Sequence, residues 1–135
     1  MTSVEDGVPL VFDTSAWVRH RQPRAEAFWK AARERKQLVS CPVAALEISR
    51  MARNEDEFEL LDGTFAGLRQ APVTESVCQS AMAASRELGA SRRLPVPDYL
   101  IAAAAAERGF GVLHVDSHFD LLATVLKFES VRLPE

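Results

Sequence analysis

Cysteine is scarce in this chain, and the few cysteines are not grouped. The 135 residues contain two, Cys41 and Cys78, which do not form a C-x-x-C pair. This count excludes a disulfide-stabilised secreted scaffold and gives no thiol pair for a structural zinc site. Both cysteines lie in apolar, alanine-rich stretches, so we expect each to be a small buried side chain.

Long apolar runs and targeting signals are also missing. The longest uncharged apolar stretch, YLIAAAAA, is far too short to cross a bilayer. The opening residues, MTSVEDG, are acidic and have no cationic segment followed by an apolar core, so they do not read as a signal peptide. We therefore expect a cytoplasmic protein with no membrane partner.

An excess of positive charge, which is common in nucleic-acid-binding proteins, is absent too. The chain has 16 basic and 19 acidic residues and a formal net charge of −3. The basic residues are nevertheless uneven, because many fall between Arg19 and Lys36 and a pair, Arg92–Arg93, lies just before Asp98. Such local patches are compatible with an RNA partner, although a charged run is more often a solvated helix face.

What the sequence does contain is enough apolar material for one α/β domain. A hydrophobic fraction of 47% over 135 residues suits a single packed unit, which we assign to residues 1–135. Short apolar runs alternate with longer helical segments, which predicts a three-layer α/β/α sandwich with a mostly parallel central sheet. The expected strands are residues 8–12, 38–40, 112–115 and 128–133. The expected helices are residues 14–20, 24–36, 42–53, 55–68 with a possible break at Gly63, 75–88, 98–108 and 117–126.

Four acidic residues occupy notable positions in this order of elements. Asp13 and Asp116 directly follow predicted strands, and Asp98 opens the alanine-rich helix. Each of these three has an alternative role as a helix N-cap. Glu47 lies inside a helix among Ala, Leu and Ile, where capping cannot explain it, although an ion pair with Arg50 can. Because the carboxyl ends of parallel strands share one edge of a sheet, we expect these acids to converge there.

Converging carboxylates require a cation, since like charges at short range raise one another's pKa. Oxygen-only ligands favour a hard divalent ion such as Mg²⁺ or Mn²⁺. An ion of this kind activates water and stabilises negative charge on a leaving oxygen. The residues by themselves therefore point to metal-assisted chemistry at a phosphate.

The stretches VFDTSAW, AALEISR, PVPDYLIAAAA and VLHVDSHFDLLA, each carrying one of the four acids, span nearly the whole chain. In order and spacing they resemble the PIN-domain family and, within it, the VapC-type toxins of bacterial toxin–antitoxin pairs. The resemblance implies a PIN-like fold and an Mg²⁺- or Mn²⁺-dependent endoribonuclease that hydrolyses RNA phosphodiesters with a metal-activated water. It also implies a homodimer, a cognate VapB-type antitoxin and an RNA substrate, for which transfer RNA is the leading candidate.

The same resemblance implies roles for individual residues. Asp13, Asp98 and Asp116 would bind the metal, and Glu47 would bind it or position the attacking water, so these four are the expected catalytic residues. The neighbouring hydroxyls of Thr14 and Ser15 are candidates to hydrogen-bond a carboxylate or the scissile phosphate, with helix capping as the alternative.

One position departs from the family pattern. Many relatives carry a further acid two residues after the fourth one, where this chain has His118. The change favours one firmly held ion over two, and gives His118 a possible contact with substrate phosphate or a metal-bound water. A half-exposed histidine at the end of a helix is the plainer alternative. Candidate phosphate contacts, which would position RNA without reading its bases, are Arg19, Arg21, Arg92 and Arg93.

Three rival interpretations remain open at this point. His114 and His118 have the H-x₃-H spacing of some zinc sites, but without a cysteine pair. A non-catalytic PIN-like module that binds RNA or protein would be expected to have lost at least one of the four acids. A metal-binding phosphoacceptor signalling domain, with Asp13 as the acceptor, would need an adjacent acidic pair and a suitably placed lysine, whereas Lys127 is the only lysine in the C-terminal half.

Overall fold

A five-stranded parallel sheet forms the centre of the computed structural model, which describes residues 7–135. Its strands are β1 (Leu10–Phe12), β2 (Leu38–Ser40), β3 (Arg69–Gln70), β4 (Gly111–His114) and β5 (Glu129–Arg132). The spatial order is β3-β2-β1-β4-β5, and every neighbouring pair is parallel. The predicted parallel α/β fold is therefore confirmed. Strand β3 was not predicted, because its two residues are both exposed and leave no apolar signal in the sequence.

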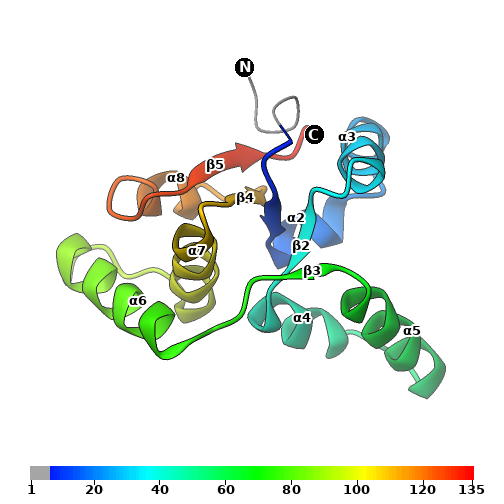
Figure 1. Ribbon diagram of the computed structural model, residues 1–135, viewed down its shortest axis with the longest axis horizontal. Helices are drawn as coiled ribbons and strands as arrows, with labels where there is room; N and C mark the ends of the chain where they lie inside the picture. Colours follow the sequence, from blue (N-terminus) through cyan, green and yellow to red (C-terminus); the bar gives the residue numbers. More distant parts are fainter. Residues whose placement is uncertain (1–6) are drawn as a thin grey trace.

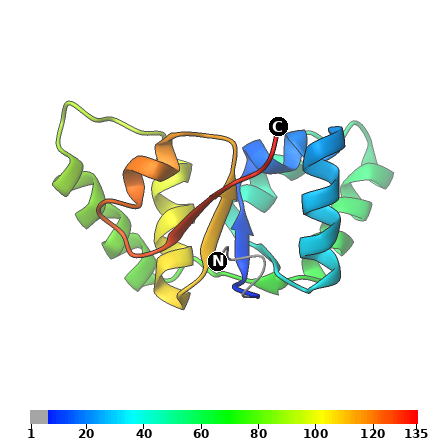
Figure 2. The ribbon, with the colours of Figure 1, turned by 90° about the horizontal axis from the view of Figure 1, so that it is seen from above.

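Helices cover both faces of this sheet. They are α2 (Thr14–Arg19), α3 (Pro23–Glu34), α4 (Pro42–Ser49), α5 (Glu55–Ala66), α6 (Glu75–Leu88), α7 (Val96–Arg108) and α8 (His118–Leu122). Figure 1 shows α4, α5, α6 and α7 on one side of the sheet and α3 on the other. Figure 2 shows that α3 and α7 run along the strands, whereas α2 and α8 lie near the carboxyl ends of the strands.

Local sequence signals set most helix boundaries. Pro42 occupies the first turn of α4, where its missing N–H costs nothing. Gly89 and Gly109 end α6 and α7 with φ angles of 85° and 71°, which glycine adopts without strain. Gly63 does not break α5 as anticipated, since a glycine costs a helix only about 1 kcal/mol. Helix α8 is shorter than expected and ends at Leu122.

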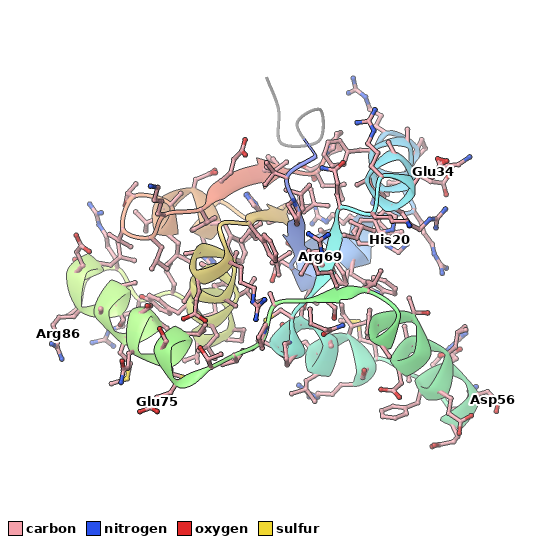
Figure 3. All side chains as sticks on the ribbon, in the orientation of Figure 1. His20, Glu34, Asp56, Arg69, Glu75 and Arg86 are labelled. Atoms are coloured by element: carbon pink, nitrogen blue, oxygen red, sulfur yellow. The ribbon has the colours of Figure 1, made fainter. Side chains whose placement is uncertain are left out.

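The core explains why α7 sits so close to the sheet. All residues of β1 and β4 are buried, as expected for strands covered on both faces. Helix α7 meets them with small buried side chains, Ala102–Ala105, which allow its backbone to approach closely. This packing fixes the first turn of α7 beside the ends of the strands. Other charged residues lie at the periphery: Figure 3 shows Glu34, Asp56, Glu75 and Arg86 on the outer surfaces of their helices.

Expectations drawn from composition have mixed outcomes. Cys41 is buried as expected, but Cys78 is exposed on α6, so the prediction of a buried thiol is wrong there. Cys78 lies on the outer side of an amphipathic helix whose buried face is formed by Val77, Ala81, Ala84 and Leu88. Within residues 7–135, no helix is both long enough and apolar enough to span a bilayer. The first six residues, on which the argument about a signal peptide rests, lie outside the described residues.

Candidate functional site

Strands β1 and β4 end side by side, and each delivers an acid to the same edge. Phe12 is paired with Leu113, and the backbone N–H of Asp13 donates to the Leu113 carbonyl at 2.9 Å. Asp116 follows two residues after β4 ends. These strands lie where the order of the sheet reverses direction, and the crevice outside such strand ends is the usual ligand site of parallel α/β folds.

Asp98 reaches this edge from α7. It lies in the first turn but is not the N-cap, which is Pro95, so the capping alternative is wrong for Asp98. The Asp98 side chain is almost entirely buried, with only 7% of the residue exposed. Its Oδ2 lies 2.9 Å from Nδ1 of His118.

His118 joins Asp98 to Asp116. The His118 backbone N–H donates to Asp116 Oδ1 at 2.9 Å, and its ring Nδ1 lies 3.1 Å from the same oxygen. One ligand atom from each of Asp98, Asp116 and His118 can be chosen so that all lie within 4.8 Å of one another. The imidazole therefore lies between two carboxylates, with its side chain 38% exposed.

Asp13 is held by its own helix and by the neighbouring strand. Its Oδ2 accepts hydrogen bonds from Ser15 N at 3.1 Å and Ser15 Oγ at 2.6 Å, so Asp13 does cap α2. Ser15 Oγ in turn accepts from the backbone N–H of Val115 at 3.0 Å. Asp13 therefore caps α2 and also lies at the strand ends, and the two hydrogen bonds from Ser15 hold its carboxylate in place.

Glu47 is connected to this cluster through a hydroxyl. Thr14 Oγ1 donates to Glu47 Oε1 at 2.7 Å, and the two residues are partly buried. The hydrogen bond links α4 to the residue that follows Asp13. Glu47 therefore turns toward Thr14 rather than toward Arg50, which is exposed at the end of α4.

The electrostatics of the cluster are those of closely spaced acids. Burial raises the pKa of Asp98 to about 6, the hydrogen bond from His118 opposes that rise, and the charges of Asp13 and Asp116 add to it. Two carboxylates and one imidazole, from Asp98, Asp116 and His118, lie close enough together to hold a divalent ion, and Asp13 adds its negative charge nearby. Burial and the two neighbouring acids both disfavour the ionised form of Asp98, and a bound cation would stabilise it, so the residues fit such an ion.

A second hydrogen-bonded group, formed by His114, Ser130 and Asp120, holds the backbone at Asp116. His114 is fully buried on β4, and its Nδ1 accepts from the backbone N–H of Asp116 at 3.1 Å. Nε2 must then carry the ring proton and donate to Ser130 Oγ at 2.6 Å, and Ser130 donates to Asp120 Oδ1 at 2.7 Å. Burial lowers the pKa of His114, which keeps the ring neutral.

This chain of hydrogen bonds answers one of the rival interpretations. Because both ring nitrogens of His114 are already engaged, His114 has none left for zinc, and the H-x₃-H interpretation is wrong. Sequence reasoning missed the group altogether. Its members come from β4, α8 and β5, and only the pairing of β5 with β4 brings Ser130 beneath the histidine.

The basic residues are divided between opposite edges of the sheet. Helix α3 starts near the candidate site and runs away from it (Figure 2), so the predicted basic segment does not lie on one surface. Arg33 and Lys36, at its far end, line a hollow with Leu38 and Arg69, residues at the starts of β2 and β3. The basic residues between Arg19 and Lys36 therefore do not form one patch beside the candidate site.

Two of the candidate phosphate contacts precede the helix that carries Asp98. Arg92 and Arg93 lie in the loop between α6 and α7, at the edge where the strands end (Figure 2). Arg93 is oriented by a hydrogen bond from its Nε to the Ala90 carbonyl at 3.1 Å. Arg19, at the end of α2, forms an ion pair of 2.6 Å with Glu135.

Comparison with known proteins gives consistent matches. The family model described as PIN domain matches residues 10–125. Ribonuclease VapC51 of Mycobacterium tuberculosis is 33% identical to this chain over 117 residues, and the match covers 85% of each of the two proteins. Ribonuclease VapC18 of the same species is 31% identical over 118 residues, and the match covers 84% of this chain and 86% of the relative. Among solved structures, DNA-bound VapBC from Salmonella typhimurium superposes with a TM-score of 0.74 at 12% identity, covering 94% of this chain and 99% of that one. VapBC-5 from Mycobacterium tuberculosis superposes with a TM-score of 0.66 at 23% identity, covering 93% and 98%.

Proposed function

This chain belongs to the PIN-domain family, and from that premise we propose that it is a metal-dependent endoribonuclease acting as the toxin of a type II toxin–antitoxin pair. The observation that carries the proposal is the close approach of Asp98, Asp116 and His118 at the edge where β4 ends, next to the strand that ends just before Asp13. The relatives named ribonuclease VapC support RNA as the substrate.

Asp13, Asp98 and Asp116 would hold the ion, which we take to be Mg²⁺ or Mn²⁺. The chemistry that it supplies when bound is a lower pKa for water and neutralisation of charge at the phosphate. The protein's share is to hold the acids in place beforehand: Ser15 fixes Asp13, α7 packing fixes Asp98, and His114 fixes the backbone at Asp116. A site prepared in this way needs little rearrangement during the reaction.

Glu47 is our candidate to position and deprotonate the attacking water. The hydrogen bond from Thr14 occupies Oε1, and within residues 7–135 no side chain or backbone group donates to Oε2. Oε2 can therefore accept a proton from water while Thr14 keeps the carboxylate oriented. A general base held in this way typically contributes a rate factor of about 10²–10⁴.

The remaining expectations complete the proposal. Residues 1–135 would act as one nuclease domain in the cytoplasm, as a homodimer controlled by a VapB-type antitoxin. The substrate would be structured RNA, with transfer RNA first, and Arg19, Arg21, Arg92 and Arg93 would contact its phosphates.

The test compares wild type with Asp98→Asn on a pool of structured RNAs, with Mg²⁺ or Mn²⁺ and with a chelator. We expect internal cleavage by wild type only when the metal is present, and none by the variant. Cleavage that persists in chelator, or that survives the substitution, would contradict the metal mechanism. RNA binding by wild type without any cleavage would favour the non-catalytic alternative.

A further inference from the structure

The ring of His118 lies where the proposed site needs a ligand. Its Nδ1 lies 2.9 Å from Asp98 Oδ2 and 3.1 Å from Asp116 Oδ1. From this geometry we infer that His118 is itself a ligand, binding the ion through Nδ1, and that the nitrogen shifts the preference of the site from Mg²⁺ toward Mn²⁺. The inference rests on the proposed function and deepens it, because it specifies the ligand set and the metal.

The distances are hydrogen-bond lengths, and they also suit atoms that share one ion. Two ligands on adjacent octahedral positions, each about 2.1 Å from the metal, lie about 3 Å apart. The separations of Nδ1 from the two carboxylate oxygens match this value, and the three ligand atoms fit within 4.8 Å. The three ligand atoms therefore lie close enough together to bind one cation.

The backbone fixes the ring in this position. His118 is the first residue of α8, and its N–H donates to Asp116 Oδ1. The following residue, Phe119, is fully buried and anchors the helix against the core. The ring thus has one edge facing the carboxylates while 38% of its side chain stays exposed.

Nitrogen ligation has a consequence for which metal is held. Mg²⁺ takes oxygen ligands almost exclusively and gives up its waters reluctantly. Imidazole binds first-row transition ions far more readily, and Mn²⁺ accepts both carboxylate and imidazole ligands. A carboxylate at position 118 would suit both ions, whereas the histidine penalises Mg²⁺.

A different role for the same ring makes the opposite prediction. If a protonated His118 stood in for the cation and had to leave when a metal arrived, removing it would strengthen metal binding. If His118 is a ligand, removing it weakens metal binding. The sign of the change in affinity separates the two roles.

The experiment uses the purified full-length chain, freed of metal and titrated calorimetrically with Mn²⁺ and with Mg²⁺. The Mn²⁺-loaded protein is then studied by electron spin-echo spectroscopy, which detects a coordinated nitrogen directly. We expect nitrogen modulation in wild type, its loss in His118→Ala, and a fall in Mn²⁺ affinity at least as large as the roughly 10–100-fold that loss of a supporting residue costs. His118→Asp should recover binding without the nitrogen signal and with a lower ratio of Mn²⁺ to Mg²⁺ affinity.

Ser117→Ala is the matched control, because Ser117 is the exposed neighbour and makes no capping hydrogen bond with its side chain. It should retain both affinities and the nitrogen signal. Wild type that binds Mn²⁺ without nitrogen modulation, or His118→Ala that binds it more tightly, would overturn the inference and leave the proposed function intact. Should wild type bind neither ion and still cut RNA in chelator, the proposed function itself would fall. Thermal unfolding is measured for each variant to establish that it is folded. If His118→Ala does not fold, the comparison of wild type with His118→Asp still tests the inference.

Discussion

Replacing Asp98 with asparagine should make the metal-free protein more stable at neutral pH while abolishing metal binding. The carboxyl group has a pKa of about 6 in the folded protein against an ordinary value of 3.8. At about 1.4 kcal/mol per pKa unit, holding this group ionised in the fold costs up to about 3 kcal/mol. Asparagine has the same shape, carries no charge and keeps an oxygen that can accept the hydrogen bond from His118.

The pH dependence follows from the direction of the shift. Because the folded protein holds the Asp98 proton more tightly than the unfolded chain does, the stability of wild type falls as pH rises from about 4 to about 6. Above that range the full cost is present, and below it the cost vanishes. Wild type and Asp98→Asn should therefore have similar stability near pH 4 and diverge as the pH rises.

The measurement is thermal unfolding in chelator across this range of pH. The variant should gain several degrees in Tm at neutral pH, where about 1 kcal/mol corresponds to roughly 2–8 °C for domains in this range of sizes. Adding Mn²⁺ should then stabilise wild type by mass action and leave the variant unchanged. Asp62→Asn, an exposed carboxylate on α5, is the control and should show neither effect. If Asp98→Asn is no more stable than wild type at neutral pH, or if its advantage does not change with pH, then burial and the neighbouring acids do not raise the pKa of Asp98 in the folded protein.

Three further variants test the supporting hydrogen bonds and the candidate phosphate contacts. Thr14→Ala should lower the cleavage rate about 10–100-fold, the equivalent of a hydrogen bond to a charged group, because Glu47 loses its orientation. Ser130→Ala should lower the free energy of unfolding by about 1–3 kcal/mol, measured by urea denaturation, since it leaves the buried N–H of a histidine without an acceptor. The double change Arg92→Gln and Arg93→Gln should weaken RNA binding and reduce the slope of log affinity against log salt by roughly 0.7 per lost phosphate contact.

Each of these has a control within the chain. Thr14→Ser keeps the hydroxyl and should retain most of the activity; equal losses in both variants would argue against the role given to Thr14. Ser130→Thr keeps an acceptor for the histidine, so a loss as large as that of the alanine variant would point to packing instead. Arg108→Gln removes a charge at the opposite end of α7 from the acids and should leave the salt slope unchanged.

Much of the fold could be predicted because apolar runs and helix-ending residues are local signals. The strand 38–40 and the helix 75–88 have the predicted bounds, set by buried Leu38–Ser40 and by Thr74 and Gly89 at the two ends of α6. Strand β3 could not be predicted in this way, since its two exposed residues are held by pairing with β2 rather than by burial.

The acids of the site were identifiable because strand ends are visible in the sequence, and parallel strands end together. Their interactions were not. The contact between Thr14 and Glu47 depends on how α2 lies against α4, and the position of His118 between two acids depends on where α7 begins. Both are consequences of packing between distant segments, which local periodicity does not describe.

The hydrogen bonds from Asp116 through His114 to Ser130 have a consequence for the order in which the protein matures during synthesis. The backbone at Asp116 is fully supported only after β5 has paired with β4, because Ser130 belongs to β5. A domain generally folds as a unit during synthesis, so this one can complete its fold only after its last strand has left the ribosome. A nascent chain that has exposed all four acids but not yet β5 therefore holds an incomplete site, and the toxic activity would be withheld until the last strand of the sheet is released.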